Sequence, residues 1–264
     1  MKKLNGLIAA AVTSLACAGV QAAPVTSWGY QVETKWINPI TFTAGGGTQT
    51  ITDSVISWGG SGALIVGGGN RSGVLIENAS QSGSITTDDM TPQLTNTFSH
   101  INNPLSTSHA TLRRATIEST LTLTPADPVG AAFPPDTLKF SINFSETPNR
   151  NGECVDAAQS VCDDIFVISF DALDNEFVYD GYKYYVSIVQ KDGALVPLGN
   201  DACAQAGVAN GCLGFLTKER EKTSIDFGIL ITSNPLLVVS EPGALALAGL
   251  GLFGLGLIRR RKAA

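Results

Sequence analysis

Residues 138–144 read LKFSINF, with apolar side chains at every second position. Successive side chains of an extended chain point to opposite faces, so a period of two predicts a half-buried β-strand. The same alternation returns at residues 120–124, 182–188 and 225–231. Residues 165–170 are apolar at all positions but one, which predicts a central strand packed on both faces.

Clusters of glycine and proline separate these stretches, and no long segment between them carries a helical period. Such punctuation between short alternating runs is typical of antiparallel strands joined by turns. The pattern predicts an all-β fold, an antiparallel β-sandwich or jelly-roll-like domain. The predicted breakers are residues 45–47, 67–69, 125–135, 148–152 and 192–193.

The first 22 residues predict an export signal. Lys2 and Lys3 precede an apolar core at residues 7–20, and a small-x-small site ends at Ala22. Signal peptidase is therefore expected to cut between Ala22 and Ala23. The exported domain would then span residues 23–239.

The chain ends in a hydrophobic run followed by a basic cluster. Residues 243–258 hold no charged or polar side chain, and as a helix these 16 residues would span about 24 Å. A bilayer core of about 30 Å can thin locally to match such a helix. We therefore predict a transmembrane helix within residues 240–264, with residues 259–264 retained in the cytoplasm. The predicted membrane stop consists of Arg259, Arg260, Arg261 and Lys262.

Charge is distributed unevenly between these ends and the domain. The whole chain has 17 basic and 23 acidic residues, and six of the basic ones lie in the two ends. The remainder holds 11 basic against 23 acidic residues, a formal charge of −12. An acidic exported domain disfavours nucleic acid and anionic lipid as partners.

The residues just before the hydrophobic run carry a family resemblance. Glu241 and Pro242, then the apolar run and the arginines, resemble the PEP-CTERM sorting signal of Gram-negative bacteria, with Ser240 in place of its first proline. The resemblance implies an exosortase partner, an integral-membrane transpeptidase that cuts near the motif and passes the protein to the surface. A permanent membrane anchor is the alternative, with the same topology.

Four of the five cysteines lie in the exported domain, as two close pairs. An oxidising compartment and an even number predict two disulfides, Cys154–Cys162 and Cys203–Cys212, among three connectivities. A zinc site formed by all four is disfavoured, because zinc ligands are usually spaced more closely. Cys17 lies in a poor lipoprotein-processing sequence, which leaves lipidation as a minor alternative.

A second resemblance lies at residues 98–104. Ser99, His100 and Asn102 resemble the Thr-His-x-Asn (THxN) motif of a family of PEP-CTERM proteins, and residues 56–59 and 177–182 resemble other blocks of that family. The resemblance implies a β-rich surface protein and supplies no activity. In an extended segment His100 and Asn102 share a face, where they could bind a metal or a substrate. The alternative is that both hydrogen-bond to the backbone nearby.

An acidic stretch follows the first cysteine pair. Carboxylates so close together could bind Ca²⁺ or cleave a glycosidic bond, whereas most such residues are solvated turns between strands. The spacing lacks the glycine of an EF-hand loop, so no cofactor is predicted and calcium remains an open alternative. The residues are Asp163, Asp164, Asp171, Asp174, Glu176 and Asp180.

Two classes of function follow from these observations. The first is a non-enzymatic protein that exosortase hands to the cell surface or extracellular space, acting in the envelope, exopolysaccharide or biofilm matrix. The second is a carbohydrate-binding or carbohydrate-active β-sandwich that uses the acidic stretch and tyrosines such as Tyr182 and Tyr185. We expect the first, because the sequence holds no catalytic constellation.

Overall fold

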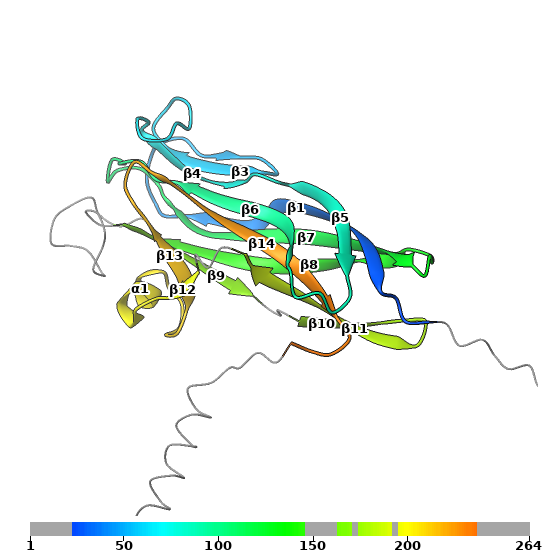
Figure 1. Ribbon diagram of the computed structural model, residues 1–264. Helices are drawn as coiled ribbons and strands as arrows, with labels where there is room; N and C mark the ends of the chain where they lie inside the picture. Colours follow the sequence, from blue (N-terminus) through cyan, green and yellow to red (C-terminus); the bar gives the residue numbers. More distant parts are fainter. Residues whose placement is uncertain (1–22, 146–162, 171–173, 192–194, 237–264) are drawn as a thin grey trace, which may run out of the picture.

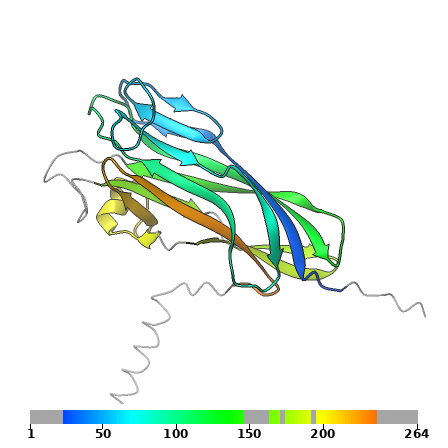
Figure 2. The same ribbon diagram turned by 45° about the horizontal axis from the view of Figure 1, so that its top comes forward.

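The computed structural model describes residues 23–145, 163–170, 174–191 and 195–236. These residues form two antiparallel sheets packed face to face (Figures 1 and 2). The predicted all-β sandwich is therefore confirmed. The expected signal peptide, the segment 240–264 and the pair Cys154–Cys162 lie outside the described residues.

The first sheet has seven strands, and long β1 and β7 lie side by side within it. Its order is β12 (Val196–Pro197), β13 (Leu213–Thr217), β9 (Asp164–Phe170), β8 (Phe133–Ser145), β7 (Leu112–Asp127), β1 (Ser27–Phe42) and β5 (Ser80–Thr86).

The second sheet also has seven strands, with β14 and β6 at its centre. Its order is β10 (Asp174–Tyr179), β11 (Tyr182–Gln190), β14 (Lys222–Thr232), β6 (Gln93–Ile101), β4 (Arg71–Ile76), β3 (Val55–Gly59) and β2 (Thr50–Ile51).

The alternating stretches all form strands, which belong to β7, β8, β11 and β14. The interruption predicted at residues 125–135 is shorter than expected, because β7 continues to Asp127 and β8 begins at Phe133. A register shift between Leu121 and Leu123 in the β7–β8 pairing leaves the two prolines after Phe133 without a β7 partner. Irregular pairing of this kind tolerates residues that cannot donate to the ladder.

The central strand β9 is buried on both faces, as predicted. Phe166 and Ile168 face the core between the sheets, whereas Ile165 and Val167 pack under the short helix α1 (Asn200–Gln205). The predicted disulfide Cys203–Cys212 is present and ties this helix to the start of β13. Since these two cysteines are bonded to each other, the alternative of a four-cysteine zinc site is wrong.

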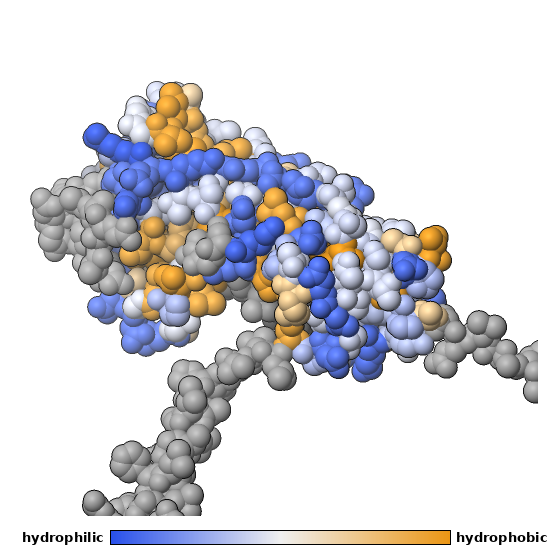
Figure 3. Space-filling model, viewed as in Figure 1, coloured by the Kyte–Doolittle hydropathy of each residue, from blue (hydrophilic) through white to orange (hydrophobic). Residues whose placement is uncertain are grey.

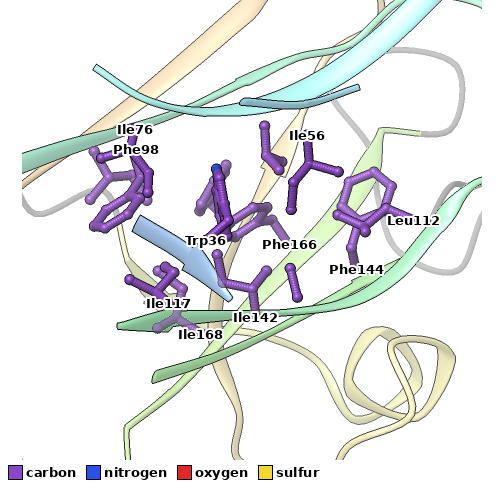
Figure 4. Packing of buried hydrophobic residues seen from close by; sticks show 14 of the residues in the cluster. Trp36, Ile56, Ile76, Phe98, Leu112, Ile117, Ile142, Phe144, Phe166 and Ile168 are labelled. Carbon is purple, nitrogen blue, oxygen red and sulfur yellow. The ribbon is translucent and has the colours of Figure 1, made fainter. Parts of the chain in front are cut away.

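The main core fills the space between the two sheets (Figure 4). Trp36 and Ile117 from the first sheet meet Ile56 and Phe98 from the second. A further cluster around Trp28 fills the other half of the sandwich. Burial of these large side chains is the main source of stability in such a fold.

The two ends of the sandwich differ in the connections that they hold. At one end, which we call the exit end, the loop after β5 contacts both the start of β1 and the end of β14: the Thr87 N–H donates to the Thr26 carbonyl and the Asp88 N–H to the Ile231 carbonyl, each over 2.9 Å. There Asp88 accepts hydrogen bonds from the Ser233 backbone N–H and hydroxyl, both 2.8 Å long. The Thr26 N–H donates to the Asp127 carbonyl over 2.8 Å, which places the turn after β7 at the same end.

At the other end, which we call the corner end, the chain crosses between sheets. Residues 218–221 connect β13 of the first sheet to β14 of the second. The loop of residues 60–70, between β3 and β4, lies at this end as well (Figure 1).

Candidate functional site

The THxN-like residues lie at the corner end of β6. This strand pairs with β14 on one side and β4 on the other, so it is central in the second sheet. Ser99 and His100 belong to the strand, and Asn102 follows its last residue. All three side chains are buried. The motif therefore occupies the interior of the sandwich and its outer sheet face, not an open cleft.

His100 is completely buried and faces the first sheet. Its Nδ1 lies 2.8 Å from the Thr217 hydroxyl of β13. Because that hydroxyl donates to the Asp164 carbonyl over 3.4 Å, we assign the ring proton to Nδ1, which donates to Thr217. The imidazole stacks on Trp58 at 6.0 Å and meets the edge of Phe144 at 4.9 Å.

The surroundings of His100 keep its ring neutral. Burial lowers the pKa of His100 from 6.5 to about 3, because the protein interior cannot solvate an imidazolium. The second nitrogen, Nε2, has no hydrogen-bond partner among the described residues. A proton on Nε2 would thus place a buried positive charge beside two aromatic rings.

Asn102 holds the chain where it crosses between the sheets. Its side-chain Nδ2 donates to the Thr217 carbonyl over 2.9 Å. Its backbone N–H donates to the Glu221 carbonyl over 3.0 Å, and its own carbonyl accepts from Arg220 over 2.7 Å. One asparagine therefore contacts both ends of the connection between β13 and β14. Together with His100 it forms what we call the corner clasp: His100, Asn102 and Thr217.

The next residue, Asn103, was not singled out by the sequence. Its Nδ2 donates to the carbonyls of Ile65 and Arg71, each over 2.7 Å. Arg71 is buried, and its guanidinium donates to the Gly60 carbonyl and the Ser57 hydroxyl, also over 2.7 Å each. Asn103 and Arg71 thus hold the loop of residues 60–70 against the outer face of the second sheet. Nothing in the local sequence distinguishes these partners from ordinary loop residues.

Ser99 points to the outer face of the second sheet. Its hydroxyl donates to Glu77 over 2.8 Å and lies 2.7 Å from the Ser224 hydroxyl of β14. Lys222 forms an ion pair with the same Glu77 oxygen. Partial burial raises the pKa of Glu77, but the bonds from Lys222 and Ser99 outweigh this, and the net pKa lies below its usual value. A carboxylate held ionised in this way is a weak base. The cluster ties β6 and β14 to the residue that follows β4.

The acidic stretch is divided between distant parts of the fold. Asp163 and Asp164 are buried at the start of β9 in the first sheet. Glu176 lies on β10 of the second sheet, where it pairs with Lys183 at 2.7 Å. Asp180 takes a positive φ of 47° in the turn between β10 and β11, a conformation that aspartate tolerates. Asp171 and the side chain of Asp174 lie outside the described residues.

No group of three potential metal ligands occurs in the described part of the chain. Calcium binding by the acidic stretch stays a prediction.

The small cavity between the sheets has a volume of about 30 Å³, enough for about one water molecule. Phe98, Ile117 and Phe227 line it, with Asn96 and Ser119 at one side.

The other family-like blocks are also structural. Residues 56–59 form most of β3 and supply Trp58, the ring that stacks on His100. Residues 177–182 form the turn of the β10–β11 hairpin. There Phe177 and Tyr179 pack edge-on against Trp28, each with ring centroids 5.5 Å apart. Tyr182 is partly buried against this cluster, and Tyr185 donates to Glu176 over 3.2 Å.

Comparison with known proteins identifies one feature of the chain. Residues 238–262 match the PEP-CTERM protein-sorting motif, which confirms the resemblance at Glu241 and Pro242. The motif indicates an exported, membrane-associated precursor that an exosortase system sorts to the cell surface. No curated protein matches the chain. Among the described residues, no helix has the length and apolar composition to cross a bilayer.

Proposed function

We propose that this protein is a non-enzymatic surface protein of the THxN family that acts in the envelope, exopolysaccharide or biofilm matrix. Signal peptidase releases it between Ala22 and Ala23, and exosortase then cuts near Glu241 and Pro242. The observation that carries the proposal is the sorting motif at residues 238–262. That motif follows directly on a stable β-sandwich whose last strand ends at Thr232.

The geometry of the corner clasp supports a non-enzymatic role. A general base must reach a proton of its substrate, and it is most effective when its pKa lies near the operating pH. His100 is fully buried, and burial lowers its pKa to about 3. Its partner Thr217 joins the two sheets, so the motif residues serve the fold.

The experiment that tests this proposal measures the intact mass of the protein in its native host. Cells with exosortase should yield a product that lacks residues 1–22 and a C-terminal piece that includes residues 243–264. Cells without the exosortase should retain the longer form in the membrane. A matched control carries Glu241→Ala and Pro242→Ala in cells with the enzyme, and should show the same longer form. Equal mass and location in both strains would refute exosortase sorting.

A carbohydrate-binding role is the second candidate. It rests on Tyr185, which is partly exposed beside Glu176 and Lys183 on the outer face of the β10–β11 hairpin. Aromatic rings next to polar groups are a common surface for sugars. A glycan array and a reducing-sugar assay test this role, with Tyr185→Ala as the binding-deficient variant. No glycan bound on the array and no reducing sugar released would exclude this role.

A further inference from the structure

Three exposed hydrophobic side chains lie on the turns and strand ends of the exit end. Val129 is 87% exposed after β7, Met90 is 60% exposed between β5 and β6, and Val178 is 52% exposed near the end of β10. Figure 3 shows a hydrophobic tip on the β7–β8 hairpin. Single exposed apolar side chains are ordinary on a protein surface, so the position of these three around the chain exit is what matters.

Hydrogen bonds place these turns beside one another. Tyr179 donates to the Ala131 carbonyl over 2.9 Å, which joins the β10–β11 hairpin to the turn after β7. The Thr87 N–H donates to the Thr26 carbonyl over 2.9 Å, and Thr26 bonds to Asp127. The loop between β5 and β6 therefore lies against the start of β1, and this start lies against the turn after β7. We call Val129, Met90 and Val178, one side chain from each of these segments, the exit patch.

The sorting motif begins within a short reach of the exit patch. Asp88 binds Ser233 directly, so the chain leaves the sandwich beside the loop that carries Met90. Only five residues separate Leu236 from Pro242. An extended chain covers at most about 3.6 Å per residue, so Pro242 lies within about 22 Å of Leu236. Any enzyme that holds Glu241 and Pro242 must therefore approach this end of the sandwich.

Charge distinguishes between two surfaces that could cover the exit patch. Asp88, Asp89, Asp127 and Asp180 lie on or beside the same turns, and Lys183, the cross-strand neighbour of Val178, is already paired with Glu176. Carboxylates are repelled by the negative surface of an anionic membrane. A protein surface can instead offer apolar hollows with hydrogen-bond donors or cations around them.

We infer that the exit patch is a docking surface for the membrane-embedded sorting enzyme, which it contacts while the enzyme holds the sorting motif. The inference rests on the proposed function, because it requires that exosortase cuts this chain. The partner surface has apolar hollows for Val129, Met90 and Val178 and a basic or donor-rich rim. The folded domain thereby adds to the recognition that the linear motif provides.

The test follows the processing of the full precursor in the native host. The exit-patch variant carries Met90→Gln, Val129→Thr and Val178→Thr, which keep side-chain size and remove apolar character. A pulse-chase experiment measures the half-time for conversion of the precursor to the sorted form. We expect this half-time to rise about fivefold, since exposed anchors of an interface contribute modestly.

A matched control carries Ile51→Thr, Ile65→Thr and Val66→Thr. These side chains are 51%, 54% and 48% exposed, much like those of the exit patch. They lie on β2 and the β3–β4 loop, far from the chain exit. Thr26 marks the exit end, whereas Trp36 donates to the Asp53 carbonyl just after β2. Trp36 follows Thr26 by ten residues, which is about 33 Å along β1. The control should be processed at the wild-type rate.

Each outcome decides one claim. Equal half-times for wild type and the exit-patch variant would overturn the docking surface and leave exosortase sorting intact. Slowing by the control variant to the same extent would also overturn it, because the effect would not be specific to this end. Failure of the wild type to depend on exosortase would overturn both proposals. Normal processing with weaker membrane retention in an exosortase-deficient strain would assign the patch to lipid instead.

Discussion

The two ends of the sandwich differ in where they place polar side chains. The corner end buries His100, Asn102 and Asn103 completely, and uses them to hold connections between and across the sheets. At the exit end Asp88 and Ser233 are exposed, and apolar side chains lie in solvent at both ends: Met90, Val129 and Val178 at the exit end, Ile65 and Val66 at the corner end. Buried polar groups cost free energy unless they are paired, and exposed apolar groups gain nothing until a partner covers them.

The difference distinguishes residues that hold the fold together from residues that are available to contact another molecule. At the corner end the chain must cross between sheets with a defined geometry, and hydrogen bonds with fixed directions specify that geometry better than apolar contacts do. At the exit end the turns are already paired, so their outward side chains are free for contacts outside the molecule. Four measurements test this contrast.

The largest effect is expected from Asn102→Ala at the corner end. The change removes the bond to the Thr217 carbonyl and leaves that buried carbonyl without its donor. The free energy of unfolding should fall by about 3 kcal/mol, the sum of a lost hydrogen bond and a small cavity. Urea unfolding of the purified protein measures it. Asn234→Ala at the exit end removes an exposed amide and should cost less than about 0.5 kcal/mol; equal losses would contradict the contrast.

A smaller loss is expected when the disulfide at the start of β13 is removed. Cys203→Ala together with Cys212→Ala opens a loop with a sequence separation of nine. The chain-entropy estimate for a loop of this size is about 2.5 kcal/mol. Thermal unfolding with and without a reductant measures the loss. If the double variant unfolds like the oxidised wild type, the bridge does not stabilise β13 and the corner that follows it.

A pH titration tests the burial of His100. Its folded-state pKa of about 3 lies below the unfolded value near 6.5, so only the unfolded chain binds the proton between these values. Stability due to this group is complete above about pH 6.5 and falls as the pH drops toward 3. Between pH 7 and 5 the loss should be about 2 kcal/mol. His100→Gln should remove this slope in urea unfolding; an unchanged slope would assign it to other groups.

The smallest effect on stability is expected from the exit-patch variant. Met90→Gln, Val129→Thr and Val178→Thr replace three apolar side chains, yet all three are more than half exposed. The free energy of unfolding should change by less than about 0.5 kcal/mol at each position. Urea unfolding beside the wild type measures this. A loss as large as that of Asn102→Ala would mean that the exit patch is part of the fold.

The pattern of the sequence was sufficient for some elements and misleading for others. Residues 138–144 and 225–231 alternate because one face of each strand is buried, and this local cause can be read directly. The prolines of residues 125–135 suggested an early break, but irregular pairing between β7 and β8 accommodates them. The helix α1 was not expected, because six residues are too few to show a helical period.

The candidate site was found only in part. His100 and Asn102 were expected on one face, and both do meet Thr217. Thr217 itself gave no signal, since it lies 117 residues from His100 and has an ordinary sequence context. Asn103 and Arg71 were missed for the same reason. The acidic residues looked like one group in the sequence, but Asp164 lies in the first sheet and Glu176 in the second.

The sequence by itself determined the sorting motif and the β class, because these depend on linear order and on a repeat of two residues. The tertiary structure decided which polar residues are buried, which strands the chain joins at the corner, and which apolar side chains remain exposed at the exit. These depend on contacts between residues more than a hundred positions apart, and local patterns do not encode which sheet a strand joins. The physical reason is that burial is a property of the assembled sandwich, whereas strand formation is a property of the segment.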